Sequence, residues 1–130
     1  MVDGENYLSK NICGIDIIAV PAKNDFHKDM CCVGYVLKIK EKKLYFAGDT
    51  STTRYMSEKL AKKNIDYAFL PCDGIYNMGI NEAKKCSKLI NARYTIPIHM
   101  KPGELFDSSI YRNFDVLNAM IMEPGIEFEL

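Results

Sequence analysis

The chain has 130 residues, which is enough for one hydrophobic core but not for two, so a single domain over residues 1–130 is expected. Basic and acidic residues number 17 each, and this formal net charge of zero argues against a nucleic-acid-binding protein, which needs a basic excess. No apolar run reaches the roughly 20 residues of a membrane span, and the polar start does not resemble a signal peptide, so a cytoplasmic protein without membrane contact is expected.

The first part of the chain has the periodicity of antiparallel strands. Residues 15–20 are apolar and β-branched, and Pro21 follows them, which predicts a strand that ends there. Residues 33–39 alternate about one apolar face, and a turn at 40–42 joins them to an apolar segment at 43–47. Three strands are therefore predicted, of which the last two form a hairpin.

From residue 49 onwards the pattern changes to helices that alternate with strands. The predicted order is a helix at about 53–63, a strand at 67–71, a helix around 83–90 and a strand at 94–98. The apolar stripe of the second helix would consist of Ala83, Cys86, Leu89 and Ile90. Such alternation favours parallel strands joined by right-handed crossovers.

The end of the chain predicts a third helix and a closing strand. Asp107 and Ser108 are suited to cap a helix. Its apolar stripe would consist of Ile110, Phe114, Leu117 and Met120. Pro124 and Gly125 then predict a turn into a last short strand at 126–130.

Polar residues follow three of the predicted strands, and together they indicate a metal site. Asp49, Asp73 and His99 stand at these strand ends, and the carboxyl ends of parallel strands form a common crevice. Two carboxylates and an imidazole are ligands for zinc or for a harder metal. Simpler interpretations stay open, since Asp49 can cap a helix, Asp73-Gly74 is a common turn pair and His99 can be a hydrogen-bonded core histidine.

Longer segments carry a more specific pattern. LYFAGDTSTTRYMSEKL contains a strand that ends in GDT, and IDYAFLPCDGIYNMGINEAKKCSKLINARYTIPIHM contains LP-x-x-G-x-Y-x-M, a helix with E-A and a strand ending in P-x-H. With IDIIAVPA near the start and PGIE near the end, they resemble the metallo-β-lactamase superfamily, in its branch of ascorbate-phosphate-lactonase-like metal-dependent hydrolases. The resemblance implies an α/β fold: the C-terminal half of an αββα sandwich, with a mixed sheet and about three helices.

The resemblance also implies roles for individual residues. Asp49 matches the family's metal-bridging aspartate, and His99 matches its last ligand histidine. His27 is a candidate third ligand. The loop residues Asp73, Gly74 and Tyr76 would line the mouth of the site and contact the substrate. The implied cofactor is a divalent metal, zinc or manganese, and the implied reaction is hydrolysis of a phosphodiester or a lactone.

One departure from the family concerns its H-x-H-x-D-H motif, which supplies most metal ligands and has no counterpart here. His27 and His99 are the two histidines of the chain. Because a catalytic zinc site uses three protein ligands, weak or absent metal binding and no activity are expected of the isolated chain, and no catalytic residue is assigned. A non-catalytic remnant or assembly module of the same fold is the alternative. A phosphatase-like domain with Asp49 as nucleophile is weaker, because no second aspartate follows two residues later.

Half of a sandwich would leave one apolar sheet face open. The candidate residues for that face are Val33, Tyr35, Leu37, Ile39, Tyr45, Phe69 and Ile96. Such a contiguous patch exceeds what monomers usually expose. A face-to-face homodimer, or a complex with a complementary N-terminal-half chain, is therefore predicted.

Overall fold

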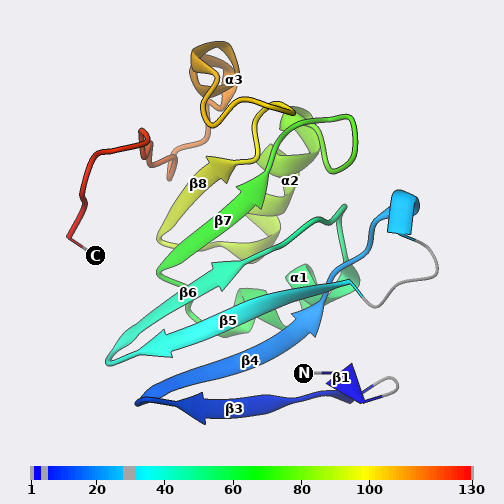
Figure 1. Ribbon diagram of the computed structural model, residues 1–130, viewed down its shortest axis with the longest axis vertical. Coiled ribbons are helices and arrows are strands. Elements are labelled where there is room, and N and C mark those ends of the chain that lie inside the picture. The colour runs from blue at the N-terminus through cyan, green and yellow to red at the C-terminus, as the bar shows by residue number, and fades with distance from the viewer. Residues whose placement is uncertain (1, 4–5, 28–31, 130) are drawn as a thin grey trace.

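The computed structural model describes residues 2–3, 6–27 and 32–129, and its centre is a six-stranded sheet (Figure 1). The strands lie in chain order: β3 (Ser9–Ile12), β4 (Ile15–Pro21), β5 (Val33–Ile39), β6 (Lys42–Phe46), β7 (Tyr67–Pro71) and β8 (Tyr94–Ile98). A separate pair, β1 (Val2–Asp3) and β2 (Asn6–Tyr7), precedes them. The hairpin between β3 and β4 was not among the predicted elements.

The strand directions change at β6, as the sequence predicts. Strands β3 to β6 are antiparallel, whereas β6, β7 and β8 are parallel. The crossovers are helical, with α1 (Arg54–Glu58) and η2 (Leu60–Lys62) before β7 and α2 (Ile80–Ile90) before β8. With η1 (Asp25–His27) and α3 (Ser108–Asn113), this confirms the mixed sheet with three α-helices. None of the described helices is long and apolar enough to span a bilayer.

Helices α1 and α2 cover one face of the sheet, behind the strands in Figure 1. The strand residues buried against them are Val20, Val36, Tyr45, Ala68 and Leu70. The helices contribute Met56, Leu60, Ala83, Cys86 and Ile90 to the same core. Because successive side chains of a strand point to opposite faces, the residues between these strand positions lie on the other side of the sheet.

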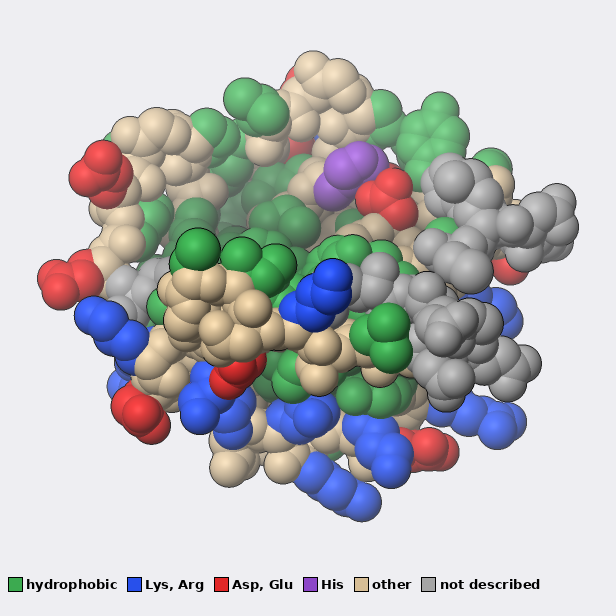
Figure 2. Space-filling model, turned by 60° about the horizontal axis from the view of Figure 1, so that its bottom comes forward, with side chains coloured by type: hydrophobic (Ala, Val, Ile, Leu, Met, Phe, Trp, Pro, Cys, Tyr) green, Lys and Arg blue, Asp and Glu red, His purple; other side chains and the backbone are tan. Residues whose placement is uncertain are grey.

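Part of that other side is apolar and only half-buried, and we call this part the open face. It is formed by Ile17, Tyr35, Leu37, Phe46 and Phe69. The first four line a shallow hollow of about 510 Å³, and Phe46 and Phe69 stack with their ring centroids 4.4 Å apart. Figure 2 shows apolar side chains around a hollow, with a histidine and acidic side chains at its rim.

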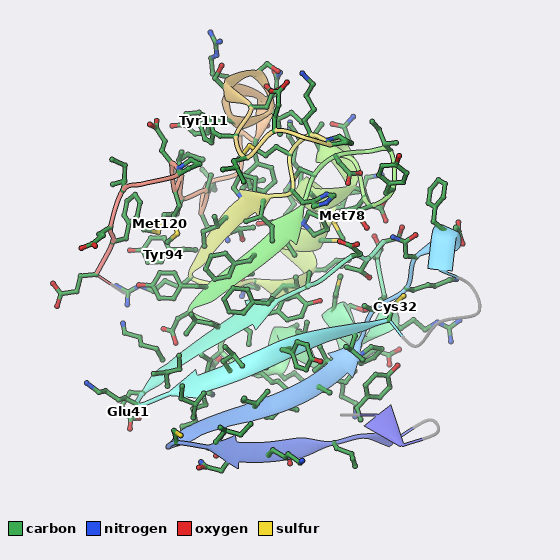
Figure 3. All side chains as sticks on the ribbon, in the orientation of Figure 1. Cys32, Glu41, Met78, Tyr94, Tyr111 and Met120 are labelled. Carbon is green, nitrogen blue, oxygen red and sulfur yellow. The ribbon has the colours of Figure 1, made fainter. Side chains whose placement is uncertain are left out.

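Tyr45 was expected on the open face, but the structure places it on the opposite side of the sheet. It is fully buried on the helix side, because it lies one residue from Phe46 and therefore points the opposite way. Ile96 lies on the open side but is covered by the C-terminal segment, which packs Met120 against this end of the sheet, beside Tyr94 (Figure 3).

The third helix is shorter than its apolar stripe predicts. Asp107 caps it as expected, since its Oδ1 accepts hydrogen bonds from the backbone N–H groups of Ser109 and Ile110, but the helix ends at Asn113. Leu117 is fully exposed. The chain beyond runs beside β8 instead.

The edge of β8 provides the reason for this course. The N–H of Thr95 donates to the carbonyl of Asn118 at 2.8 Å, and the N–H of Met120 donates to the carbonyl of Thr95 at 2.9 Å. These bonds pair the carbonyl of Asn118 and the N–H of Met120, which would otherwise form hydrogen bonds within a longer helix. The predicted closing strand is also wrong, because residues 126–129 are not in a strand; Leu130 lies outside the described residues.

The stripe of α2 differs from the prediction at one position. Leu89 is 38% exposed, whereas Ser87 is buried. The Ser87 hydroxyl lies 2.9 Å from Thr95 Oγ1 and donates to Asn118 Oδ1 at 3.0 Å, so this polar side chain is satisfied inside the protein.

The buried hydroxyl of Tyr45 leads to a stability prediction. Among the described residues it has no hydrogen-bond partner, and burial raises its pKa, so it is a neutral, unpaired phenol. Replacing Tyr45 by Phe should raise the free energy of unfolding by about 1 kcal/mol, because an unsatisfied polar group leaves the core. Urea denaturation measures this, with Tyr35→Phe on the open face as the control. A loss of stability in Tyr45→Phe would show that the hydroxyl is bonded.

Candidate metal site

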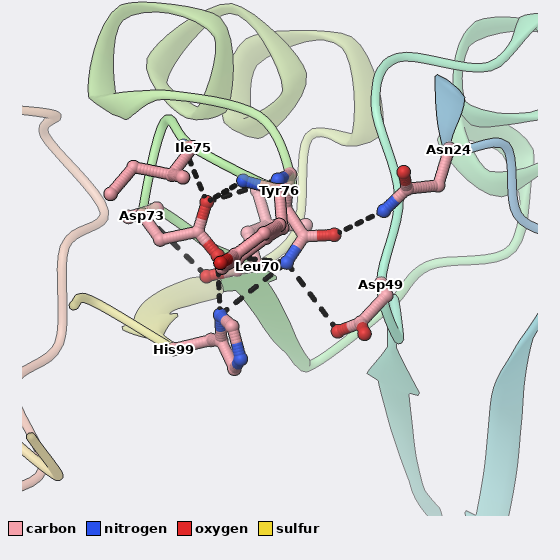
Figure 4. A network of polar contacts seen from close by, with 9 residues as sticks. Asn24, Asp49, Leu70, Asp73, Ile75, Tyr76 and His99 are labelled. Carbon is pink, nitrogen blue, oxygen red and sulfur yellow. Dashed lines mark hydrogen bonds and ion pairs between the residues drawn. The ribbon is translucent and has the colours of Figure 1, made fainter. Parts of the chain in front are cut away.

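The three polar residues that the sequence singles out lie together at one edge of the sheet (Figure 4). Asp49 follows β6, Asp73 follows β7 and His99 follows β8. These strands are parallel, in a register that pairs Phe46 with Phe69 and Phe69 with Ile96. Their carboxyl ends therefore meet at the same edge, as predicted.

Gly48 turns the chain out of the sheet immediately before Asp49. Its φ is +67°, and a Cβ at this position would lie 2.6 Å from the carbonyl oxygen of Val33. Only glycine fits both the backbone conformation and this close approach. The next helix has Thr53 as its N-cap, so Asp49 is not the capping residue that the simpler interpretation of the sequence requires.

Asp73 uses both carboxylate oxygens inside the protein. Oδ1 accepts hydrogen bonds from the backbone N–H groups of Ile75, Tyr76 and Asn77 at 2.8, 3.0 and 2.9 Å. Oδ2 accepts from Asn77 Nδ2 at 2.9 Å and lies 2.6 Å from His99 Nδ1. Burial raises the pKa of Asp73, but the hydrogen bonds outweigh it and the net pKa is below its usual value. The group is therefore an ionised carboxylate at neutral pH.

The ionised Asp73 determines the proton position on His99. A carboxylate only accepts hydrogen bonds, so His99 Nδ1 is the donor, and the neutral form of this imidazole has its lone pair on Nε2. The imidazole is 45% exposed, and Nε2 has no protein partner among the described residues. Asn77 Nδ2 lies 3.4 Å from the same Nδ1, but both atoms are donors, so this contact is not a hydrogen bond.

Asp49 is exposed and loosely held. Its Oδ1 lies 3.5 Å from Asn77 Nδ2, and its Oδ2 has no hydrogen-bond partner in the described part of the chain. Asn77 is thus in contact with Asp49, Asp73 and His99. It was not among the site residues predicted from the sequence. It follows three exposed loop residues, and only its place inside the LP-x-x-G-x-Y-x-M pattern could have drawn attention to it.

The other predicted site residues border this cluster. Gly74 has a φ of +65° and forms the turn that wraps the backbone around the Asp73 carboxylate. Tyr76 is 50% exposed and contacts Phe26 edge to face, with ring centroids 5.5 Å apart. The Asp73 side chain is 0% exposed, because its two oxygens are occupied within the protein. The His27 side chain lies outside the described residues.

The donor chemistry fits a divalent metal, but the number of donors is small. Asp49 Oδ2 and His99 Nε2 are an oxygen and a nitrogen that zinc and manganese accept, whereas Asp73 is already saturated. Within the described residues, no three His, Cys, Asp or Glu side chains are placed to hold an ion together. The described residues therefore offer two ligands, one fewer than a catalytic zinc site takes from protein.

Comparisons with known proteins agree with the fold. Residues 3–99 match the family model described as the beta-lactamase superfamily domain. A metal-dependent hydrolase of Pyrococcus horikoshii is 31% identical over 137 residues, covering 98% of this chain and 60% of that protein. One from Enterococcus faecalis is 41% identical over 94 residues, covering 71% of this chain and 42% of that protein.

A solved structure shows the same architecture. The metallo hydrolase from the archaeon Ignicoccus hospitalis superposes with a TM-score of 0.70 and 25% identity, covering 89% of this chain and 55% of that one. The chain thus spans about 60% of the length of the Pyrococcus relative and just over half of the solved structure. Its sequence pattern, strand order and similarity over nearly its full length place the chain in the metallo-β-lactamase superfamily, among relatives named metal-dependent hydrolases.

Proposed function

We propose that this chain supplies part of the active site of a divalent-metal-dependent hydrolase, with Asp49 and His99 as its metal ligands. The observation that carries the proposal is the pair of free donor atoms, Asp49 Oδ2 and His99 Nε2, at one edge of the sheet. Asp73 supports it, because a carboxylate bonded to the second nitrogen of an imidazole is the usual partner of a metal-bound histidine.

The residues of this chain have separate tasks in this proposal. The carboxylate of Asp49 would hold the metal, and Asp73 fixes the orientation and tautomer of His99, so that the Nε2 lone pair is directed outwards. When bound, the metal, zinc or manganese, lowers the pKa of a water and polarises the substrate oxygen. Tyr76 and Phe26 form an exposed aromatic pair beside the site, suited to the apolar part of a phosphodiester or lactone substrate.

The remaining ligands come from a segment outside these 130 residues that packs on the open face. Two ligands hold an ion weakly, since binding free energy falls with each missing ligand. The Pyrococcus relative is longer than this chain, which covers 60% of it, so its other part is a suitable donor of the missing ligands. His27, next to Phe26 in η1, is a further candidate ligand from this chain.

A non-catalytic assembly module is the second candidate. The half-buried open face and the two-ligand site favour it. The fully bonded network around Asp73 favours the hydrolase, because a module that only packs has no need of an exposed imidazole fixed in one tautomer.

Metal analysis distinguishes the two candidates. The isolated chain should lose zinc and manganese on dialysis. A chimera that joins it to the part of the Pyrococcus relative that it does not cover should retain stoichiometric metal. Asp49→Ala or His99→Ala should abolish this retention. Asp16→Ala is the matched control, since the Asp16 side chain accepts a hydrogen bond from Asn11 on the β3–β4 hairpin, outside the cluster of Asp49, Asp73 and His99. Stoichiometric metal in the dialysed isolated chain would refute the need for ligands from outside it, whereas retention unchanged in both site variants would refute Asp49 and His99 as ligands.

A further inference from the structure

We infer that Asn77 is a positioning residue whose side-chain amide sets the separation of Asp49 and His99. The roles of these two residues as ligands rest on the proposed function, whereas the positioning itself is a property of the folded chain. Asn77 lies in the loop between β7 and α2, and it is only 9% exposed.

The sheet alone does not fix the distance between the two ligands. Strands β6 and β8 are not neighbours, because β7 lies between them. No backbone hydrogen bond of the sheet therefore joins the chain near Asp49 to the chain near His99, and both side chains are exposed. Side chains over the end of β7 must make the link.

The Asn77 amide completes that link. Of its two N–H groups, one donates to Asp73 Oδ2 at 2.9 Å and the other faces Asp49 Oδ1 at 3.5 Å. Asp73 Oδ2 also accepts the Nδ1–H of His99 at 2.6 Å. A continuous series of polar contacts thus runs from His99 through Asp73 and Asn77 to Asp49 (Figure 4).

Asn24 holds the Asn77 amide in the required orientation. Asn24 Nδ2 donates to Asn77 Oδ1 at 2.7 Å, and Asn24 Oδ1 accepts the backbone N–H of Phe26 at 2.8 Å. Asn24 is 4% exposed, so this pair is buried. With its oxygen occupied by Asn24, Asn77 presents only N–H groups to the two carboxylates. The reversed amide would place its oxygen against both carboxylates, which repel it.

Amide proton exchange in the metal-free chain is the first test. Nuclear magnetic resonance should show slow solvent exchange for the Asn77 side-chain amide and a nuclear Overhauser effect to the Nδ1–H of His99. The amide of Asn81, exposed at the start of α2, is the internal reference. The chain has two histidines, so His27→Gln identifies the His99 signals. An Asn77 amide that exchanges as fast as Asn81 would overturn the inference.

Zinc affinity is the second test and needs no enzymatic activity. Asn77→Ala should weaken zinc binding by about 10-fold or more, the range seen when a residue that orients a ligand is removed. The matched control Asn81→Ala should bind as the wild type does. Weaker binding in Asp49→Ala and His99→Ala, but not in Asn77→Ala, would reject the positioning role and leave the ligands intact. If the wild-type chain binds no zinc, the exchange measurement alone decides.

Discussion

Replacing Leu37 by lysine should convert the isolated chain from a dimer to a monomer at micromolar concentration. We propose that two copies pack their open faces together when no complementary half is present. Leu37 lies in the middle of that face and lines its hollow with Tyr35 and Phe46. A lysine there would bring an unpaired charge into the interface.

The size of the expected effect follows from the apolar area involved. At roughly 25 cal/mol per Å², covering about 400 Å² on each of two copies contributes on the order of 20 kcal/mol. Association and side-chain ordering cost about 4–15 kcal/mol, so a modest surplus remains. Burying an unpaired charge should weaken the affinity of the dimer by more than about 100-fold. Because each copy carries the substitution, two-fold symmetry doubles the free-energy cost.

Sedimentation velocity measures this transition. Leu89→Lys is the matched control, because Leu89 is 38% exposed on α2 at the helix side of the sheet, and it should leave the dimer unchanged. A wild-type chain that sediments as a monomer would refute the dimer. Dissociation of the dimer on addition of the complementary half would show that both partners use the open face.

Hydrolytic activity should appear only in the assembled protein and should depend on Asp49. In the chimera with the Pyrococcus segment, Asp49→Asn keeps the shape of the side chain but removes the charge that binds the ions. The fall in kcat/KM should exceed the roughly 10- to 100-fold that is typical when a residue supporting a ligand is lost. Asp73→Asn leaves Asp49 in place but disturbs the hydrogen bonds that orient His99 and Asn77, and its effect should remain within that range.

The assay compares a phosphodiester and a lactone substrate at saturating zinc or manganese. The isolated chain should hydrolyse neither. Substantial activity in the isolated chain would show that its own residues complete the site. Equal activity of Asp49→Asn and wild-type chimera would remove Asp49 from the reaction and favour the assembly module.

The sequence by itself determined strands β4 to β8, their directions and the residues at their ends. Alternation about one apolar face defined β5, and Pro21 and Pro71 marked strand ends, because these signals depend only on neighbouring residues. The change to strand–helix alternation after Asp49 favoured parallel strands, and their common carboxyl edge brings Asp49 and His99 to the same place. The family motifs led to the same two residues.

Only the tertiary structure decided which loop side chains meet at that edge. Asp73 looks like a turn residue in the sequence, yet it supports His99, and Asn77 gave no local signal. Their contacts with Asp49 and His99 join positions 22 to 28 residues apart and depend on the order of three strands. The C-terminal segment shows the same limit, since helix periodicity predicted one stripe, but hydrogen bonds to the edge of β8 hold the chain beyond Phe114 outside the helix. Periodicity describes what a segment does alone, whereas these contacts arise only when distant segments are packed together.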